Sequence, residues 1–189
     1  MSSFDHLALL RQRFHQPSDP PAQAERARSM LQLLLAQDGS TTRLCEAIAD
    51  GPVSLHVLAQ RVVDVVPAEV RATLPGSGFI ERITCLAAHG QVLMDNLTYI
   101  ALDGLPADVR RDLEAGVMPI GHLLARLWVR RTFLDAAPVL YERLWDAVGG
   151  LADADASRTY CIATPEGPRM LIAETYRRGM LMERPAAGA

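Results

Sequence analysis

Two pairs of strand-like segments constrain the fold of this chain more than any other feature of its sequence. Phe79 to Ala87 and Gln91 to Leu102 are separated only by Ala-His-Gly, in which glycine can supply the positive φ that a hairpin needs. The second pair, Arg158 to Thr164 and Arg169 to Tyr176, flanks a run of Pro, Glu, Gly and Pro, which is a strong turn signal. We therefore expect two antiparallel strand pairs.

The remaining regular segments predict helices and two further extended stretches. Apolar residues at helical spacing follow the Asp-Pro-Pro run at residues 19–21 as far as about Gln37, and we expect Asp19 to cap this helix. The run Val53 to Val66 is too rich in valine for a helix, so it predicts one long or bent strand. Other helices are expected at Arg43 to Ala49, Pro106 to Gly116, Met118 to Leu127 and Ala137 to Val148, an extended stretch at Trp128 to Leu134, and a loop marked by Pro67 and Leu74 to Gly78.

The order of these segments predicts the fold class. Strands lie mainly in the middle and at the end of the chain, and the regular strand-helix alternation of a parallel sheet is missing. We therefore expect an α+β fold, a single domain with an antiparallel β-sheet whose one face is covered by helices. A chain of 189 residues that is 49% apolar can bury one core. The domain is expected to take in residues 1–189, with 1–18 and 185–189 flexible.

Composition and the missing motifs exclude several classes of function. The formal net charge is −3 and the basic residues are scattered, so no nucleic-acid footprint is visible. The odd number and wide spacing of Cys45, Cys85 and Cys161 predict buried thiols, not disulfides or a zinc site. The histidines lack metal-ligand spacing, and no nucleotide loop or nucleophile elbow occurs. Because neither a secretory leader nor a membrane span is evident, we expect a cytoplasmic protein without cofactor or metal.

Charged residues inside two apolar strands are the candidate functional groups. Period-two alternation places Arg82 on the face of Ile80 and Thr84, whereas Glu81 goes to the other face, so one of these charges must point toward the packed side. Glu174 likewise lies within an apolar run and requires a partner. Spacing alone favours a cross-strand ion pair between Arg82 and Glu174, or a solvated face.

A wider pattern resembles the chorismate lyase family. From about residue 33 to 179, five local matches occur in the family's order. They comprise an apolar helix end and turn at Leu34 to Arg43, a first strand at Val53 to Leu55, an arginine-bearing strand and hairpin at Arg82 to Gly90, a Pro-apolar-Gly helix start at Met118 to Leu124, and a last strand at Leu171 to Glu174.

The resemblance implies a chorismate pyruvate-lyase, which eliminates pyruvate from chorismate to give 4-hydroxybenzoate for ubiquinone or a secondary metabolite. Arg82 would bind the ring carboxylate, because its planar guanidinium can hold a carboxylate in a bidentate manner. Glu174 would contact the C4 hydroxyl and either transfer a proton or orient the substrate. Backbone N–H groups of Ser40 and Ile120, with Gly121, would complete the substrate site. The partner is then the small anionic substrate, and the chain a monomer or small homo-oligomer.

Several features leave room for other interpretations. The segment from residue 136 to 155 is longer than expected, and Arg177 and Arg178 add charge after Glu174. The helices at Ala24 to Gln37 and Ala137 to Val148 are candidate covers for a pocket. A diverged enzyme could catalyse another elimination or rearrangement of a chorismate-like acid. The fold also serves as the effector-binding half of bacterial regulators, although about forty residues before the first strand are few for a DNA-binding domain and linker.

Overall fold

A six-stranded antiparallel sheet organises the fold in the computed structural model, which describes residues 11–115, 120–124, 128–135, 137–149 and 152–181. The strand order is β1-β2-β3-β6-β5-β4, and every neighbouring pair is antiparallel. The predicted α+β fold on an antiparallel sheet is confirmed. The strands are β1 (Ser54–Val63), β2 (Phe79–Ala88), β3 (Gln91–Ala101), β4 (Arg130–Leu134), β5 (Ser157–Thr164) and β6 (Gly167–Tyr176).

Helices connect these strands. They are α2 (Pro21–Ala36), α3 (Thr41–Ala49), α4 (Ala68–Thr73), α5 (Ala107–Ala115), α6 (Ile120–Leu124) and α7 (Pro138–Ala147), with single 3₁₀ turns at Ala154–Ala156 and Arg178–Leu181. Part of the predicted helix from Met118 to Leu127 lies outside the described residues. None of the described helices combines the length and apolar character that crossing a membrane requires.

Both predicted hairpins form, for the reasons that their turn residues suggested. Between β2 and β3 the loop is His89-Gly90, with φ values of 50° and 74°. Two successive positive φ angles match the twist of an antiparallel pair, and glycine adopts them without strain. Between β5 and β6 the loop is Pro165-Glu166. The predicted long first strand is also present, and a register shift between Val57 and Ala59 bends it.

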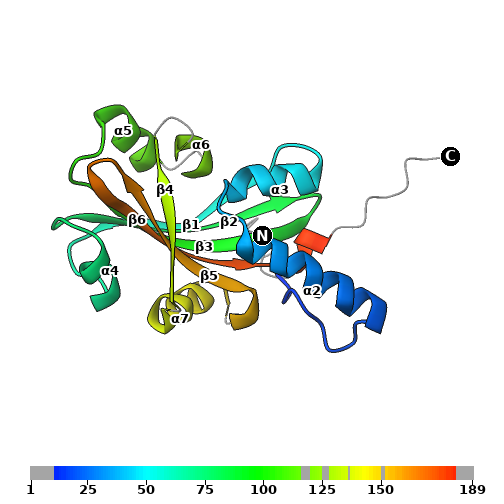
Figure 1. Ribbon diagram of the computed structural model, residues 1–189. Helices are drawn as coiled ribbons and strands as arrows, with labels where there is room; N and C mark the ends of the chain where they lie inside the picture. The colour runs from blue at the N-terminus through cyan, green and yellow to red at the C-terminus, as the bar shows by residue number, and fades with distance from the viewer. Residues whose placement is uncertain (1–10, 116–119, 125–127, 136, 150–151, 182–189) are drawn as a thin grey trace.

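Helices cover both faces of the sheet, so the prediction of a single covered face is wrong. Figure 1 shows α3, α5 and α6 on one side and α4 and α7 on the other. Val109 and Leu113 of α5 pack against Ile80, whereas Leu140 of α7 packs against Phe79. All ten residues of β2 are buried. A strand without an exposed face needs cover on both sides, and α7 together with α4 supplies the second layer.

Two local predictions also need correction. The predicted loop between Pro67 and Gly78 contains α4, whose Val70 is fully buried. Asp19 does not cap α2: the N-cap residue is Pro20, which makes no side-chain cap. The Asp19 carboxylate instead pairs with Arg178 at 2.7 Å. Within the segment 1–18, which we expected to be flexible, Phe14 is buried against α2 and the sheet, and the tail 185–189 lies outside the described residues.

Candidate functional site

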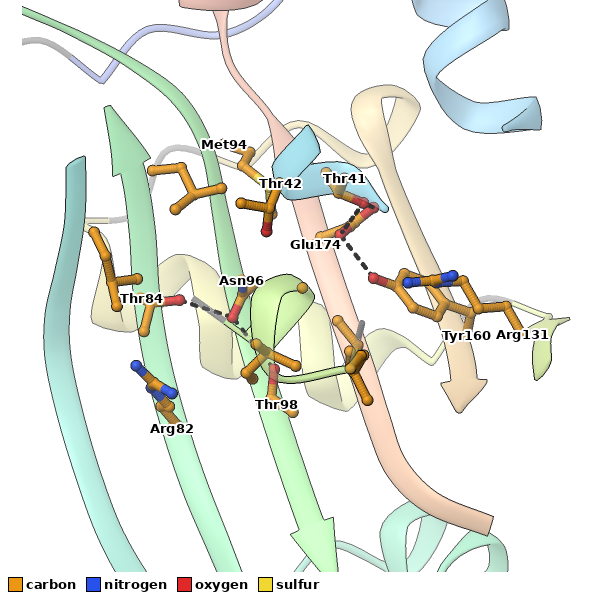
Figure 2. A pocket seen from close by; sticks show the side chains of 16 residues that line it. Thr41, Thr42, Arg82, Thr84, Met94, Asn96, Thr98, Arg131, Tyr160 and Glu174 are labelled. Carbon is orange, nitrogen blue, oxygen red and sulfur yellow. Dashed lines mark hydrogen bonds between the residues drawn. The ribbon is translucent and has the colours of Figure 1, made fainter. Parts of the chain in front are cut away.

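A narrow pocket lies between the sheet and the first turns of α3 and α6. Its floor comes from β2, β3, β5 and β6, and its rim includes Thr41, Thr42, Ile120 and Gly121. The empty volume is about 470 Å³ even when the part open to solvent is included. Figure 2 shows polar side chains from β2 to β6 and from α3 around this space. The pocket is therefore sheltered by two helix starts that lie far apart in the sequence.

Arg82 enters the pocket from β2. Its side chain is fully buried, and it lies on the same sheet face as Thr84, as period-two alternation predicts. Burial lowers the pKa of the Arg82 guanidinium from its usual value, but an arginine remains charged in proteins. The pocket therefore contains a buried positive charge.

Glu81 points to the opposite face, so both neighbouring charges are buried. Its carboxylate is held by Arg61 at 2.8 Å, Arg143 at 2.6 Å and the Tyr99 hydroxyl at 2.6 Å. Burial favours the neutral acid, but hydrogen bonds from Arg143 and Tyr99 outweigh it and lower the pKa of Glu81. We expected one of the two charges to point toward the packed side, and both do, because the sheet is packed on both sides.

Glu174 enters the pocket from β6 and is surrounded by hydrogen-bond donors. Arg158 Nε lies 2.6 Å from its Oε1, and the Tyr176 hydroxyl donates to the same oxygen at 3.1 Å. The Tyr160 hydroxyl donates to Oε2 at 3.1 Å, and Thr41 Oγ1 lies 3.2 and 3.3 Å from the two oxygens. A carboxylate only accepts hydrogen bonds, so these donors match its needs. Tyr160, Thr41 and Glu174 also line the pocket.

Arg158 ties Glu174 to the end of α2. Its Nη1 donates to the main-chain carbonyls of Leu34, Leu35 and Gln37 at 2.8, 3.1 and 2.7 Å. Its guanidinium also lies 5.2 to 5.4 Å from the ring centroids of Phe133, Tyr160 and Tyr176. Burial works against its charge, but the Glu174 carboxylate together with Tyr176 and Tyr160 outweighs burial, and the pKa of Arg158 is raised. Arg158 thus fixes the Glu174 carboxylate and caps the C-terminal end of α2 next to the pocket rim.

Arg82 and Glu174 share one face but are not cross-strand neighbours. Strand β3 separates them: Arg82 is opposite Thr98, whereas Asn96 is opposite Glu174. The interpretation as a cross-strand ion pair is therefore wrong. Two strand spacings put their backbones about 10 Å apart across the sheet. Thr84, Asn96 and Thr98 form the floor of the space between them. The hydroxyls of Thr84 and Thr98 donate to Asn96 Oδ1 at 3.0 and 3.3 Å.

The starts of α3 and α6 meet at the rim. Ser40 is the N-cap residue of α3 and accepts a hydrogen bond from the Arg43 N–H at 3.4 Å. A Cβ on Gly121 would clash with Thr42 Oγ1 and come within 2.8 Å of Ser40 Oγ, so only glycine lets the two helix starts approach so closely. Arg82, Ile120, Gly121 and Glu174 line the pocket, and Ser40 lies just outside its lining.

Sequence reasoning missed several polar residues of the pocket. Tyr160 and the Glu174-binding Arg158 alternate along β5 with Ile162, and this period was a usable signal that both face the same side. Arg131 lay in a predicted extended stretch without a stated role, and Asn96 gave no signal of its own. Among the described residues, no three His, Cys, Asp or Glu side chains come together as a metal site would require.

A search of curated proteins finds relatives of known name. The chain is similar to chorismate pyruvate-lyase. The protein of that name from Mycobacterium tuberculosis is 27% identical over 168 residues, which cover 82% of this chain and 83% of the relative. The chorismate pyruvate-lyase from Mycobacterium bovis matches with the same identity and coverage. A scan against models of known protein families gives no match.

Solved structures show a weaker likeness. A putative regulator from Escherichia coli is 13% identical with a TM-score of 0.45, covering 71% of this chain and 100% of that one. The ligand-binding domain of a putative GntR-family transcriptional regulator from Bordetella bronchiseptica is 15% identical with a TM-score of 0.41, covering 67% and 83%. Nothing about the activity of this chain follows from likeness at that level.

Proposed function

We propose that this protein is a chorismate pyruvate-lyase, which converts chorismate to 4-hydroxybenzoate and pyruvate. The observation that carries the proposal is that Arg82 and Glu174 face one sheltered pocket from strands two positions apart. The similarity to chorismate pyruvate-lyases over 82% of the chain supports the same activity.

The reaction requires few catalytic groups. The bond between ring carbon C3 and the ether oxygen breaks, and its electron pair leaves with the enolpyruvyl group. The hydrogen on C4 is lost as a proton, the ring becomes aromatic, and the released enol takes up a proton to become pyruvate. Aromatisation supplies the driving force, so the protein has to bind, orient and desolvate the substrate and manage one proton.

In the proposed complex Arg82 binds the ring carboxylate. A buried guanidinium holds a carboxylate through two parallel hydrogen bonds, which fixes the plane and direction of the ring. The backbone N–H of Ile120, with Gly121 and the adjacent Ser40, would lie at the rim around the ligand. The close approach of α3 and α6 at Gly121 keeps this part of the pocket narrow and excludes water.

Glu174 then meets the opposite end of the ring. Its Oε2 accepts from Tyr160 and Thr41, two neutral hydroxyl donors that a substrate hydroxyl can replace. Its Oε1 is held by Arg158, which keeps the carboxylate in place when the substrate arrives. A hydrogen bond from the C4 hydroxyl to Glu174 places the C4 hydrogen and the C3 leaving group in a defined orientation.

The test is incubation of the purified protein with chorismate, without added metal or nucleotide. Pyruvate is measured by a coupled dehydrogenase assay and 4-hydroxybenzoate by chromatography. Equal amounts of both products support the proposal. Binding without turnover would instead indicate an effector-binding protein, and a different product would indicate another reaction of the same acid.

Variants of the two pocket residues make the test specific. Arg82→Ala is expected to raise KM for chorismate at least 10-fold, because a charge-assisted hydrogen bond is lost. Glu174→Gln is expected mainly to lower kcat. Glu142→Gln, an exposed position on α7 across the sheet, is the matched control and is expected to leave both constants unchanged. Near-normal kinetics in both pocket variants would contradict the assignment of the site.

A further inference from the structure

A second arginine lines the pocket on the side away from Arg82. Arg131 comes from the edge strand β4, and Figure 2 shows it beside Tyr160, whereas Arg82 and Thr84 lie on the opposite side of the view. Its Nη1 donates to the main-chain carbonyl of Asp38 at 3.1 Å. Its Nε is buried and has no hydrogen-bond acceptor within the described part of the chain. A buried guanidinium N–H without an acceptor is a place for a ligand oxygen.

Charge in and behind the pocket favours a ligand with two negative groups. Glu174 is paired with Arg158, so these two charges offset each other. Arg82 and Arg131 each bring a positive charge to the pocket wall. A ligand with one carboxylate matches only one of them. Two carboxylates match both, and they offset the unfavourable burial of like charges on one wall.

The spacing of the two arginines fits such a ligand. Four strand spacings separate β2 from β4, so the two backbones are about 19 Å apart across the sheet. Two long side chains reaching inward and a substituted six-membered ring fill this distance. Glu174 and Tyr160 lie on the strands in between, β6 and β5. The arrangement offers one cation for each end of a dicarboxylate and a hydroxyl-binding carboxylate between them.

We propose that Arg131 binds the second carboxylate of a dicarboxylate ligand, the one on the enolpyruvyl side chain, while Arg82 binds the ring carboxylate. This inference rests on the proposed function, because it names the substrate group that Arg131 takes. Pyruvate carries the second carboxylate away, so 4-hydroxybenzoate keeps its contacts with Arg82 and Glu174 but loses the one with Arg131. Arg131 is thus a specificity residue for the dicarboxylate substrate over the monocarboxylate product.

The test uses two stable ligands that require no turnover. One is 3-(carboxymethoxy)-4-hydroxybenzoate, which has a second carboxylate on an ether arm. The other is 4-hydroxy-3-methoxybenzoate, which has the same ring and ether but no second carboxylate. Calorimetric titration of the wild type, Arg131→Ala and Arg130→Ala gives the affinity of each protein for each ligand. Arg130 is the matched control, since it is an exposed arginine of the same strand and alternation directs it to the other face.

Wild type is expected to bind the dicarboxylate more tightly than the methoxy compound. Arg131→Ala is expected to weaken dicarboxylate binding about 10- to 100-fold, the loss of one hydrogen-bonded charge, and to change methoxy binding less than about 2-fold. Arg130→Ala is expected to change neither by more than about 2-fold. Should Arg131→Ala destabilise the edge strand, Arg131→Gln is expected to show the same selective loss.

Three results would overturn the inference. They are an equal effect of Arg131→Ala on both ligands, an equal loss in Arg130→Ala, and failure of the wild type to prefer the dicarboxylate. Release of pyruvate from chorismate by the wild type tests the proposed function separately. A protein that shows the selective loss but no turnover would keep the dicarboxylate site and lose the proposed activity.

Discussion

Replacing Arg158 with glutamine tests how Glu174 is held in the pocket. The side chain of Arg158 is 6% exposed and that of Glu174 is 1% exposed, and their 2.6 Å contact is accompanied by three hydrogen bonds from Arg158 to the end of α2. Arg158→Gln removes the cation and leaves the Glu174 carboxylate buried without its charged partner. The variant therefore changes both the stability of the fold and the placement of the carboxylate.

The expected loss of stability follows from burial. Breaking a buried ion pair by removing one partner costs about 3–5 kcal/mol. The carbonyls of the half-buried Leu35 and Gln37 can turn to water, and the buried Leu34 carbonyl still accepts from the Tyr176 hydroxyl at 3.1 Å, so they add little to this loss. We expect the free energy of unfolding to fall by about 4 kcal/mol. For a chain of this size, 1 kcal/mol shifts Tm by about 2–4 °C, so Tm should fall by about 8–16 °C.

Thermal and denaturant unfolding of Arg158→Gln, Glu174→Gln, the double variant and Arg110→Gln measure this effect. Arg110→Gln is the control, because its 2.8 Å pair with Glu114 lies on the surface of α5 and contributes at most about 0.5 kcal/mol. In the Arg158→Gln background, Glu174→Gln should restore part of the lost stability, since it removes the unpaired buried charge. A loss below about 1 kcal/mol in Arg158→Gln, or no coupling to Glu174→Gln, would refute the reasoning.

Three further perturbations address the rim, the hydroxyls and the thiols. Gly121→Ala should push α6 away from α3 and raise KM for chorismate several-fold. Gly51→Ala is the control: a Cβ there meets no atom within 4 Å, so KM should be unchanged. Equal KM values in the two variants would contradict the close approach of the helices at the rim. Tyr160→Phe removes a hydrogen bond to Glu174. Burial and then the Glu174 charge raise the pKa of Tyr160, so the hydroxyl stays protonated and kcat of the variant should fall by the same factor at pH 6 and pH 9. A loss of kcat at only one of these pH values would contradict this assignment of the protonation state. Burial raises the pKa of the Cys85 thiol from 9.0 to about 11, so the contribution of this thiol to stability is complete below about pH 8 and is lost between pH 9 and 11. At pH 8 a thiol reagent should therefore modify the native protein slowly and the unfolded protein at all three cysteines. A native thiol that reacts fast would show that burial is incomplete.

The sequence allowed prediction of those features that depend on local geometry. Glycine and turn residues located both hairpins, because few residues accept the positive φ angles that tight loops require. Period-two alternation correctly placed Arg82 with Thr84 and Glu174 with Tyr176 on their own strands. Whether the two charges shared a face was not readable from either strand alone, since it depends on the register of β3 between them.

Features that depend on long-range packing escaped prediction. The two-residue loop pairs Thr164 with Gly167, and continuing that register without interruption would place Arg158 opposite Ala173. A bulge between Ile162 and Ala163 shifts the pairing by one residue and brings Arg158 opposite Glu174. A one-residue shift turns every side chain to the other face, so the partner of Glu174 could not be derived from turn and alternation alone. The second helical layer escaped because α4 is too short to show helical periodicity, and because the face that α7 covers depends on long-range packing.

The most direct test of the central claim is a crystal structure of the protein with 4-hydroxybenzoate. We expect the ring to lie in the pocket above Thr84 and Asn96, with its carboxylate against the Arg82 guanidinium and its hydroxyl within hydrogen-bond distance of Glu174. A ligand bound in the reversed direction, or bound elsewhere on the molecule while this pocket stays empty, would contradict the roles assigned to both residues.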